Sequence, residues 1–329
     1  MKYKSSVIIC TRERHSKLRV TLARLNKLLP KGIPVFLVDQ SSAPFIIDDF
    51  SKLDIRYFHT PHQKGLGRAR NMGLSKGIAD VMCWIDDDCI VSREFIAAFQ
   101  KTAKLAHVAR QKRIAGVFGQ TRAYFKTRPD SSYQSSCLFT KKNVKPVTKV
   151  GVHWKDVGYG NNMILFGYIF DVMGPFKNWL GPGSISKNGD DGEFILRCLI
   201  NKYSFLYDPN LLMYHNMWMT PPQFKKQYRD YYCGGLVIYG FYAFQNVPIC
   251  QKEFQLEVRN SIYKMTESLR SLKKMPETFF TQLTELWWEF STLIRGVLLA
   301  FWFAKVVPIP LKERINVSRE GLEPATRKV

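Results

Sequence analysis

Apolar and polar residues alternate in short blocks over the first hundred positions, and this pattern predicts strands and helices in turn. Four apolar runs bounded by polar turns are typical of short buried strands: 7–10, 35–38, 55–59 and 81–85. Leucines at three- and four-residue spacing predict a helix between the first two runs, at positions 18, 22, 25 and 29. Because buried strands joined by helices form parallel sheets, we expect an α/β fold with a mostly parallel central sheet and helices on both faces.

Polar side chains stand where these strands end. Thr11 follows the first run, Asp39 the second and Asp86-Asp87-Asp88 the fourth. Ligands of parallel sheets bind beyond the carboxyl ends of the strands, so we expect these residues at one edge. Three carboxylates after a buried strand offer oxygen ligands to a hard divalent cation and to the phosphates it neutralises. For the acidic cluster taken alone, a solvated turn is the alternative.

Four segments occur in the order and spacing of a known family: 6–12 (SVIICTR), 38–41 (VDQS), 65–73 (GLGRARNMG) and 84–88 (WIDDD). Over roughly residues 5–235 the chain therefore resembles the glycosyltransferase family 2 proteins, which have the GT-A fold. The resemblance implies a Rossmann-like sheet, a nucleotide-sugar donor and a sugar transfer that inverts the anomeric centre.

For the donor, the resemblance implies a role for each residue that matches a motif. Thr11 and Asp39 would contact the base and ribose, and Arg70 would lie near the diphosphate. We include Arg12, beside Thr11, in the same predicted donor site. Gln40 departs from the family pattern, because many family members carry a second acid at this position. The difference affects how the ribose or the base is recognised.

For the metal, the resemblance identifies Asp86 and Asp88 as the DxD motif. The sugar diphosphate leaves as an anion, so Mn²⁺ or Mg²⁺ held by Asp88 would stabilise it as a Lewis acid, with Asp86 as a further ligand or a ribose contact. Two interpretations of Asp87 remain open: it is a turn residue that faces solvent, or it contacts the ligand in the donor site directly. Similar enzymes often have a His near the diphosphate, so His215 is a candidate third metal ligand, with a structural role as the alternative.

A second acidic group precedes a predicted helix at 194–200. A sugar hydroxyl must lose its proton to attack an anomeric carbon, and a positioned carboxylate is the usual base. The family has an acidic pair at this place, which Asp190-Asp191 resembles. We therefore expect Asp191 as general base and Asp190 as the residue that orients the acceptor or the base, with Glu193 as the next candidate. The alternative is that these acids only complement the helix dipole.

Basic residues outnumber acidic ones by 49 to 27, for a formal net charge of +22. Between positions 101 and 155 the bias is strongest, and Asp130 is the single acid there. We expect this segment beside the site, facing a phosphorylated acceptor or an anionic membrane surface. No recognition motif with interleaved aromatics stands out, so nucleic acid is not an expected partner. Arg229, in the basic segment 225–229, is expected to bind diphosphate after loop closure, with a solvated basic helix as the alternative.

The carboxyl-terminal third has a different composition. Residues 286–307 are rich in tryptophan and aliphatic side chains, but their uninterrupted part, 296–304, is shorter than the ~20 residues that span a bilayer. We expect an interfacial or re-entrant helix, with a buried core helix as the alternative, and an amphipathic helix over 251–284. The predicted domains are a catalytic domain at 1–235, a helical membrane-associating region at 236–311 and a polar, disordered tail at 312–329.

Two observations concern the compartment. The seven cysteines lack metal-ligand spacing, so we expect reduced thiols that lie mostly in the core. The amino terminus enters the first apolar run too early for a secretory signal. We therefore expect the catalytic body at the cytoplasmic face of the cell membrane, as a peripheral or monotopic protein.

Taken with these observations, the family resemblance implies a metal-dependent inverting glycosyltransferase that moves a sugar from a nucleotide-diphosphate donor to a saccharide acceptor, including a lipid-linked one, in cell-surface polysaccharide biosynthesis. Two other classes remain open. A nucleotidyltransferase would share the nucleotide site and the acidic metal ligands but would release pyrophosphate. A non-catalytic basic scaffold would bind membrane or RNA without metal-dependent binding of a nucleotide-sugar.

Overall fold

The computed structural model describes residues 3–47, 49–141, 154–272 and 279–307. The chain divides into two compact units, of which the first comprises Met1–Ile185 and Asp190–Gln227 and the second Ser186–Gly189 and Tyr228–Val329. The predicted tail at 312–329 lies outside the described residues, and the predicted domain boundary after residue 235 stays a prediction.

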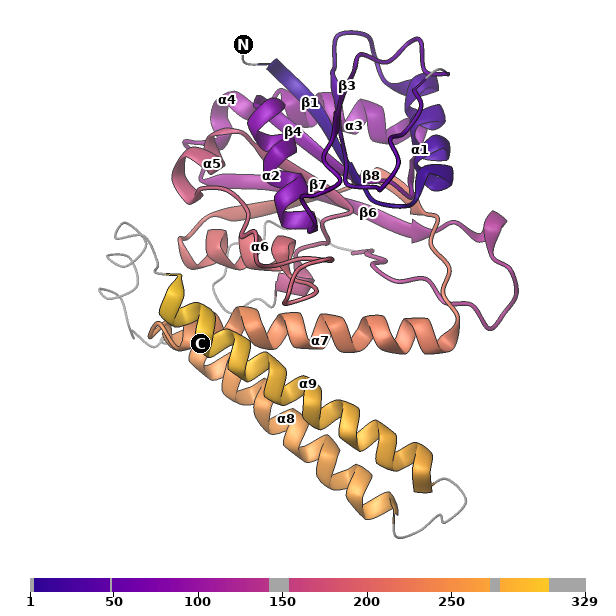
Figure 1. Cartoon of the computed structure of the whole chain (residues 1–329). Coiled ribbons are helices and arrows are strands. Elements are labelled where there is room, and N and C mark those ends of the chain that lie inside the picture. The colour runs from indigo at the N-terminus through magenta and orange to yellow at the C-terminus, as the bar shows by residue number, and fades with distance from the viewer. Residues whose placement is uncertain (1–2, 48, 142–153, 273–278, 308–329) are drawn as a thin grey trace, which may run out of the picture. The chain divides into compact units, whose positions relative to one another are not determined.

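Within the described part of the first unit, eight strands form one sheet in the order β3-β2-β1-β4-β7-β6-β8-β5. Figure 1 labels these strands except β2 and β5. The strands are β1 (Tyr3–Thr11), β2 (Val35–Asp39), β3 (Ile55–His59), β4 (Ala79–Asp86), β5 (Cys89–Val91), β6 (Ile114–Ala123), β7 (Asn162–Phe166) and β8 (Ser204–His215). β1 pairs in parallel with β2 and β4, β2 with β3, and β6 with β8, whereas β7 and the short edge strand β5 pair antiparallel with their neighbours. The expected α/β fold with a mostly parallel sheet is confirmed.

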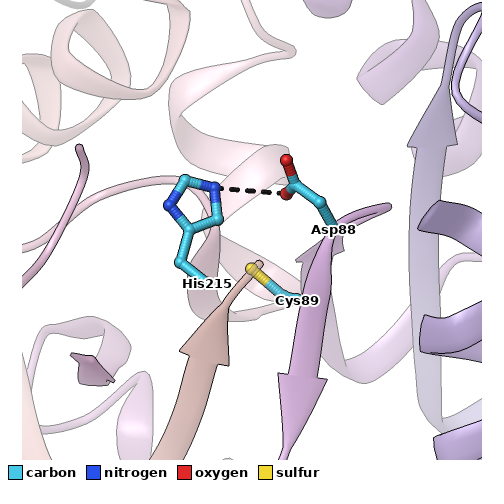
Figure 2. Close-up of side chains that lie close together, drawn as sticks. All are labelled: Asp88, Cys89 and His215. Atoms are coloured by element: carbon cyan, nitrogen blue, oxygen red, sulfur yellow. Dashed lines mark ion pairs between the residues drawn. The ribbon is translucent and has the colours of Figure 1, made fainter. Parts of the chain in front are cut away.

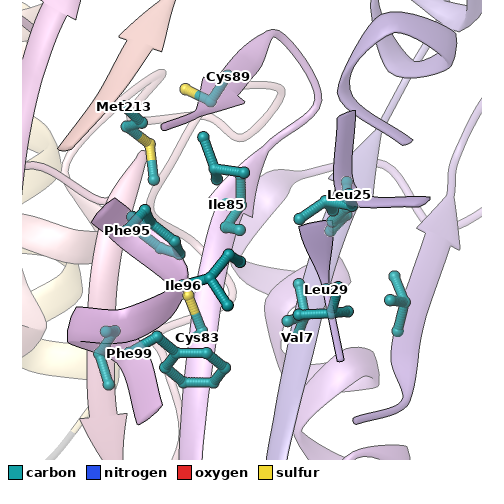
Figure 3. Packing of buried hydrophobic residues seen from close by; sticks show 14 of the residues in the cluster. Val7, Leu25, Leu29, Cys83, Ile85, Cys89, Phe95, Ile96, Phe99 and Met213 are labelled. Atoms are coloured by element: carbon teal, nitrogen blue, oxygen red, sulfur yellow. The ribbon is translucent and has the colours of Figure 1, made fainter. Parts of the chain in front are cut away.

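Helices cover both faces of this sheet. They are α1 (His15–Leu28), α2 (Leu66–Lys76), α3 (Arg93–Ala103), α4 (Ala106–Ala109), α5 (Tyr168–Met173) and α6 (Asp190–Ile200). Alternation along β1 separates the two faces: Val7 lies in one apolar cluster with Leu25 of α1 and Phe95 of α3 (Figure 3). The next residue, Ile8, points the other way and contacts the backbone of α2 at Gly73. The helix predicted around residues 18–29 is therefore confirmed.

The strand register brings the predicted site residues to one edge. Thr11 at the end of β1 pairs with Asp39 at the end of β2, and Cys10 pairs with Asp86 at the end of β4. β8 ends at the same edge with His215, because β6 runs parallel to β4 across the antiparallel β7, and β8 runs parallel to β6. The expectation that the polar strand ends meet at one edge is confirmed.

The basic segment at 101–155 does not lie wholly beside that edge, which corrects the sequence expectation. Residues 110–113 directly precede β6, so they stand at the opposite edge of the sheet from the acidic run. Arg122 and Lys126 lie at and beyond the carboxyl end of β6, on the side of the acidic run. Three lysines of the segment lie outside the described residues: 142, 145 and 149.

β8 runs without a break through residues 208–210, although these residues include a proline. Gly119 of β6 pairs with Asp208, whereas Gln120 pairs with Leu212, so the extra residues bulge out of β8. Pro209 has no N–H to offer a ladder, and a bulge is a place where a strand tolerates it.

The second unit is helical. It contains α7 (Pro221–Ala243) from Tyr228 onward, together with α8 (Pro248–Leu272) and α9 (Phe279–Val306), and α8 and α9 lie side by side (Figure 1). Gly240 of α7 allows close packing, since a Cβ there would stand 2.5 Å from Ala300 of α9 and 2.8 Å from Phe254 of α8. Among the helices described, none has both the length and the hydropathy needed to cross a bilayer.

All seven cysteines are free thiols, and five of them are buried. The expectation that the cysteines lie mostly in the core is confirmed, and their reduced state stays a prediction.

Candidate active site

Asp87 lies at the centre of the acidic run and points inward. Its buried carboxylate accepts a hydrogen bond from Thr11 Oγ1 at 2.6 Å, and its Oδ1 lies 2.6 Å from Arg14 Nη2. The backbone carbonyl of Asp87 accepts a further hydrogen bond from Thr21 Oγ1 of α1 at 2.9 Å. The solvent-facing interpretation of Asp87 is therefore wrong. Asp87 ties the end of β1 and helix α1 to the turn between β4 and β5.

Asp88 and His215 form a buried pair at the ends of β4 and β8. Arg14 Nη1 donates to Asp88 Oδ2 at 2.7 Å, and Asp88 Oδ1 faces His215 Nε2 at 3.2 Å (Figure 2). The other ring nitrogen, Nδ1, lies 2.8 Å from the carbonyl oxygen of Ser136. Because a carbonyl only accepts, we assign the ring proton to Nδ1, and a neutral ring then turns the lone pair of Nε2 toward Asp88.

Cys89 stands next to this pair. It is the register partner of His215 across the antiparallel strands β5 and β8. Among the described residues, one ligand atom from each of Asp88, Cys89 and His215 lies within 4.8 Å of the other two. Burial and the nearby carboxylates raise the pKa of Cys89, so its sulfur is a neutral thiol when no cation is bound.

The acids of the run differ in their electrostatics. Burial raises the pKa of Asp86 and raises the pKa of Asp87 to about 7. Burial alone would raise the pKa of Asp88 as well, but His215 and Arg14 outweigh it and hold that pKa below its usual range. Burial by itself lowers the pKa of His215, and the neighbouring Asp88 carboxylate reverses this and raises it. Asp88 is therefore kept ionised by the positive charge of Arg14 and by its pairing with His215.

The residues present fit a divalent cation. Asp88 Oδ1 is buried and receives no hydrogen bond of good geometry, although His215 Nε2 lies opposite it. Carboxylate oxygen and neutral imidazole nitrogen are ordinary ligands of divalent metals in proteins. A cation between the two would satisfy both atoms, and in its absence a proton on Nε2 takes that place. His215 is thus positioned as the predicted third metal ligand requires.

Asp39 is held by several donors at the end of β2. Its carboxylate accepts hydrogen bonds from the Ser41 N–H at 2.8 Å and the Tyr57 hydroxyl at 2.9 Å, and His15 Nε2 lies 3.2 Å away. Burial would raise the pKa of Asp39, but these hydrogen bonds outweigh it and lower the pKa. At the next position, Gln40 Nε2 donates to the carbonyl oxygen of Gly65 at 3.1 Å. An acid at position 40 has no proton to donate here, which gives the departure from the family pattern a structural reason.

Arg70 of α2 joins the acidic run to α6. Its Nη1 donates to Asp190 Oδ2 at 2.5 Å, and its Nη2 lies 3.9 Å from Asp86 Oδ1. Burial raises the pKa of Asp190 to about 6. Gly160 is needed beside this pair, because a Cβ there would stand 2.3 Å from Arg70 Nη2. The structure therefore brings together Arg70 and two predicted site carboxylates.

Asp191 is the more accessible acid of its pair, being half-buried where Asp190 is buried. Asp191 Oδ2 accepts a hydrogen bond from the Gly160 N–H at 2.6 Å, and Oδ1 accepts one from the Gly192 N–H at 2.8 Å. Glu193, the other candidate base, is fully buried and paired with Arg197 at 2.9 Å. Accessibility therefore favours Asp191 over both Asp190 and Glu193 as a group that meets a substrate.

Two predicted donor-site residues lie outside this network. Arg12 is exposed, and a Cβ at Gly183 would stand 3.3 Å from its Nη1. Arg229 belongs to the second unit, where its Nη2 donates to Glu285 at 2.8 Å and its guanidinium lies 5.1 Å from the ring centre of Trp288. Diphosphate binding by Arg229 stays a prediction.

Sequence reasoning missed three residues that support the site: Arg14, Tyr57 and Cys89. Arg14 and its partner Asp87 are 73 positions apart in the sequence, and no local sequence pattern predicts a contact over that distance. Tyr57 lies on the strand next to the one that ends at Asp39, which becomes informative once the order of the strands is known. Cys89 directly follows the acidic run, and that adjacency was the available signal.

Residues 6–155 match the model of the family described as Glycosyl transferase family 2. Pre-mycofactocin glycosyltransferase from two strains of Mycobacterium tuberculosis is 35% identical to this chain over 94 residues, which make up 28% of this chain and 19% of that protein. The match therefore spans less than a fifth of the length of these curated relatives.

Two solved structures resemble the chain over most of its length. S. aureus TarS 1-349 in complex with UDP-GlcNAc has a TM-score of 0.54 at 15% identity, covering 93% of this chain and 92% of that one. The mannosyltransferase PcManGT from Pyrobaculum calidifontis, in complex with GDP-Man and Mn²⁺, has a TM-score of 0.52 at 12% identity, covering 92% of this chain and 88% of that one. At such identities the likeness concerns the fold, and the expected GT-A fold is confirmed.

Proposed function

We propose, on the premise that residues 6–155 belong to glycosyl transferase family 2, that this protein transfers a sugar from a nucleotide-diphosphate donor to a saccharide acceptor. The observation that carries the proposal is the buried pair of Asp88 and His215 at the carboxyl edge of the sheet, where β1 and β2 also end with Thr11 and Asp39. Oxygen and nitrogen ligands at such an edge suit a divalent cation together with a bound diphosphate.

Asp88 and His215 would hold Mn²⁺ or Mg²⁺, with Asp86 as a further oxygen ligand. The cation, when bound, would supply positive charge to the diphosphate as its bond to the sugar breaks. Support comes from the Mn²⁺ and GDP-Man bound to the mannosyltransferase of the same fold. Arg14 would help the diphosphate to bind, because its pairing with Asp87 and Asp88 reduces the repulsion between the acidic run and an incoming diphosphate.

Asp191 would act as the general base of an inverting displacement. The acceptor hydroxyl oxygen attacks the anomeric carbon, its proton passes to Asp191, and the bond from that carbon to the diphosphate oxygen breaks on the opposite face. The Gly160 N–H holds one carboxylate oxygen of Asp191 in place. Asp190 acts through Arg70, which it fixes next to Asp86.

For the donor, UDP-GlcNAc and GDP-Man in the two relatives of the same fold support a nucleotide-sugar. For the acceptor, the net charge of +22 supports an anionic partner, such as a phosphorylated or lipid-linked saccharide in cell-surface polysaccharide biosynthesis.

We also propose that this protein acts at the cytoplasmic face of the membrane, as a peripheral or monotopic protein. In the second unit, α8 and α9 line an apolar groove of about 780 Å³ with Ile262, Met265, Thr266, Leu269, Leu283, Leu286, Trp287 and Phe290. Further large apolar side chains are exposed along α9: Trp288, Ile294, Leu298, Phe301, Trp302 and Val306. Tryptophans concentrate at membrane interfaces, and soluble monomeric proteins rarely expose large contiguous apolar patches.

Thermal stabilisation by nucleotide-sugars tests the donor site. UDP-, GDP-, dTDP- and CDP-sugars are added to the full chain with and without Mn²⁺. A ligand at ~100 times its dissociation constant raises the free energy of unfolding by about 2.7 kcal/mol. We expect a Mn²⁺-dependent rise in melting temperature with one nucleotide class and its loss in Asp88→Asn. No rise with any donor, with or without the metal, would contradict the proposal.

Sugar transfer by Asp191→Asn tests the base. Removal of a general base lowers the rate by roughly 10²- to 10⁴-fold, while donor binding should persist. Asp156→Asn is the matched control, because Asp156 is an exposed acid in the neighbouring turn Trp154–Asp156. Full activity in Asp191→Asn would refute this role. Release of pyrophosphate in place of nucleoside diphosphate would identify a nucleotidyltransferase.

A further inference from the structure

A thiol that the proposed reaction does not use lies inside the candidate metal site. Cys89 stands directly opposite His215 in the antiparallel pair of β5 and β8, so both side chains project from the same face of the sheet. Figure 2 shows the Cys89 sulfur near the space between the imidazole of His215 and the carboxylate of Asp88. The three residues each bring one ligand atom within 4.8 Å of the other two.

We propose that Cys89 is the third protein ligand of the cation held by Asp88 and His215, an inference that rests on the proposed function. Asp88 Oδ1 supplies the second, independent observation: it is buried, receives no hydrogen bond of good geometry and faces His215 Nε2 at 3.2 Å. The Nδ1–H of His215 is used by the Ser136 carbonyl, which leaves Nε2 available for a metal. Oxygen, nitrogen and sulfur therefore converge on one buried space.

The spacing is compatible with a single ion. Ligand atoms that each lie about 2.0 to 2.3 Å from a metal stand roughly 3.3 to 4.3 Å from one another. Separations of up to 4.8 Å therefore close by small side-chain rotations, without movement of the strands. On binding, a sulfur–metal bond forms and the thiol proton passes to solvent.

A sulfur ligand changes which metal the site prefers. Mg²⁺ and Ca²⁺ favour oxygen ligands, whereas thiolate and imidazole together suit Zn²⁺, Co²⁺ and related transition metals. Cys89 should therefore shift the preference of this site away from Mg²⁺ and toward transition metals. The competing explanation is packing alone, because Cys89 is also part of the apolar cluster that includes Cys83 and Met213.

The experiment is a titration of the full chain with Co²⁺, followed by absorption spectroscopy and calorimetry. We expect a sulfur-to-cobalt charge-transfer band in the near ultraviolet that is absent from Cys89→Ala and from Cys89→Ser. Cys83→Ala is the matched control: Cys83 is buried in the same cluster but lies outside the three-residue group, so its loss should leave the band intact. The affinity for Co²⁺ should fall about tenfold or more in Cys89→Ala, whereas the affinity for Mg²⁺ should change by less than about twofold.

The outcomes separate this inference from the function it rests on. If Co²⁺ binds and Asp88→Asn abolishes the binding, but no charge-transfer band appears, Cys89 is not a ligand and the metal site of the proposed function stands. If Co²⁺ and Mn²⁺ both fail to bind in the presence of the nucleotide, both proposals fall. A correctly folded Cys89→Ser variant that keeps the band would also overturn the inference.

Discussion

Arg14 shows at the scale of a single residue how three consecutive acids are accommodated in a buried turn. Its guanidinium pairs with Asp87 and Asp88 at once, with contacts of 2.6 and 2.7 Å. Without it, two buried carboxylates would repel each other in surroundings of low dielectric constant. At Asp88, His215 adds to the effect of Arg14 and the pKa of the carboxylate falls. At Asp87, burial outweighs Arg14 and raises the pKa to about 7.

Asp39 and Tyr57 provide a prediction about stability and pH. The pKa of Asp39 in the folded protein lies below its usual value of 3.8, so the unfolded chain binds more protons between the two values. The stabilisation by this carboxylate is thus complete above pH 3.8 and is lost as the pH falls through the folded-state pKa. Tyr57→Phe removes a hydrogen bond to this anion and should cost about 2 kcal/mol at pH 7.

Urea unfolding at a series of pH values measures this cost. We expect the loss in Tyr57→Phe to shrink to about 1 kcal/mol once Asp39 is protonated, because hydrogen bonds to neutral groups are weaker. Tyr3→Phe is the control, since Tyr3 packs against Phe36 and has no carboxylate partner among the described contacts. A loss in Tyr57→Phe that is equal at every pH would show that Asp39 is not the group concerned.

At the scale of elements, helix α2 lies against β1 through a glycine. A Cβ at Gly73 would stand 2.4 Å from Cγ2 of Ile8, whose side chain is fully buried. Gly73→Ala therefore gains helix propensity, about 1 kcal/mol, but overpacks the contact by about 1 to 3 kcal/mol. We expect a net loss of up to about 2 kcal/mol, seen as a lower melting temperature of the first unit.

Gly235 of α7 is the matched control, because a Cβ there would meet nothing within 4 Å. Gly235→Ala should raise stability by about 0.5 to 1 kcal/mol through helix propensity alone. If Gly73→Ala were stabilising as well, α2 would not be packed against β1 as closely as the structure indicates.

The elements also show where sequence reasoning succeeds and where it ends. β1, β2 and β4 follow from continuous apolar runs, and Thr11, Asp39 and Asp86 follow at the edge because parallel strands end together. β6 was not predicted, because its sequence contains Gly116 and Gly119. Both glycines pack against the backbone of a neighbouring strand and add no apolar side chain to the pattern. Such contacts depend on which strand lies beside which, and apolar periodicity along one chain carries no information on that order.

The same limit applies to the site. The acidic run and Asp190-Asp191 were found from local pattern and family resemblance, but Arg70 lies 120 positions from its partner Asp190. The role of Asp87 depended on burial, which a polar tripeptide after a strand leaves open. The basic segment was misplaced for a related reason, since charge composition does not say at which end of β6 the residues stand.

At the scale of the whole molecule, burial of acids makes the outer surface more basic than the formal charge of +22 suggests. Asp39, Asp87, Asp88, Asp190 and Glu193 are all buried and therefore contribute little to the exposed surface. A surface of this kind attracts phosphate groups at low ionic strength and releases them as salt screens the field. The proposed anionic bilayer would match both this charge and the exposed apolar residues of the second unit.

Vesicle flotation of the full chain tests that combination. Trp287 and Leu298 of α9 are 63% and 62% exposed, and each should contribute about 1.5 to 3 kcal/mol when buried in an interface. Trp287→Glu with Leu298→Glu should therefore weaken binding to anionic vesicles by at least about a hundredfold. Phe125→Glu is the control, because Phe125 is an equally exposed aromatic residue, at 67%, in the first unit. Unchanged flotation of the double variant would exclude α9 as the contact. Concentration-dependent dimerisation that the double variant loses, without vesicle binding by the wild type, would show that a second copy covers this face instead.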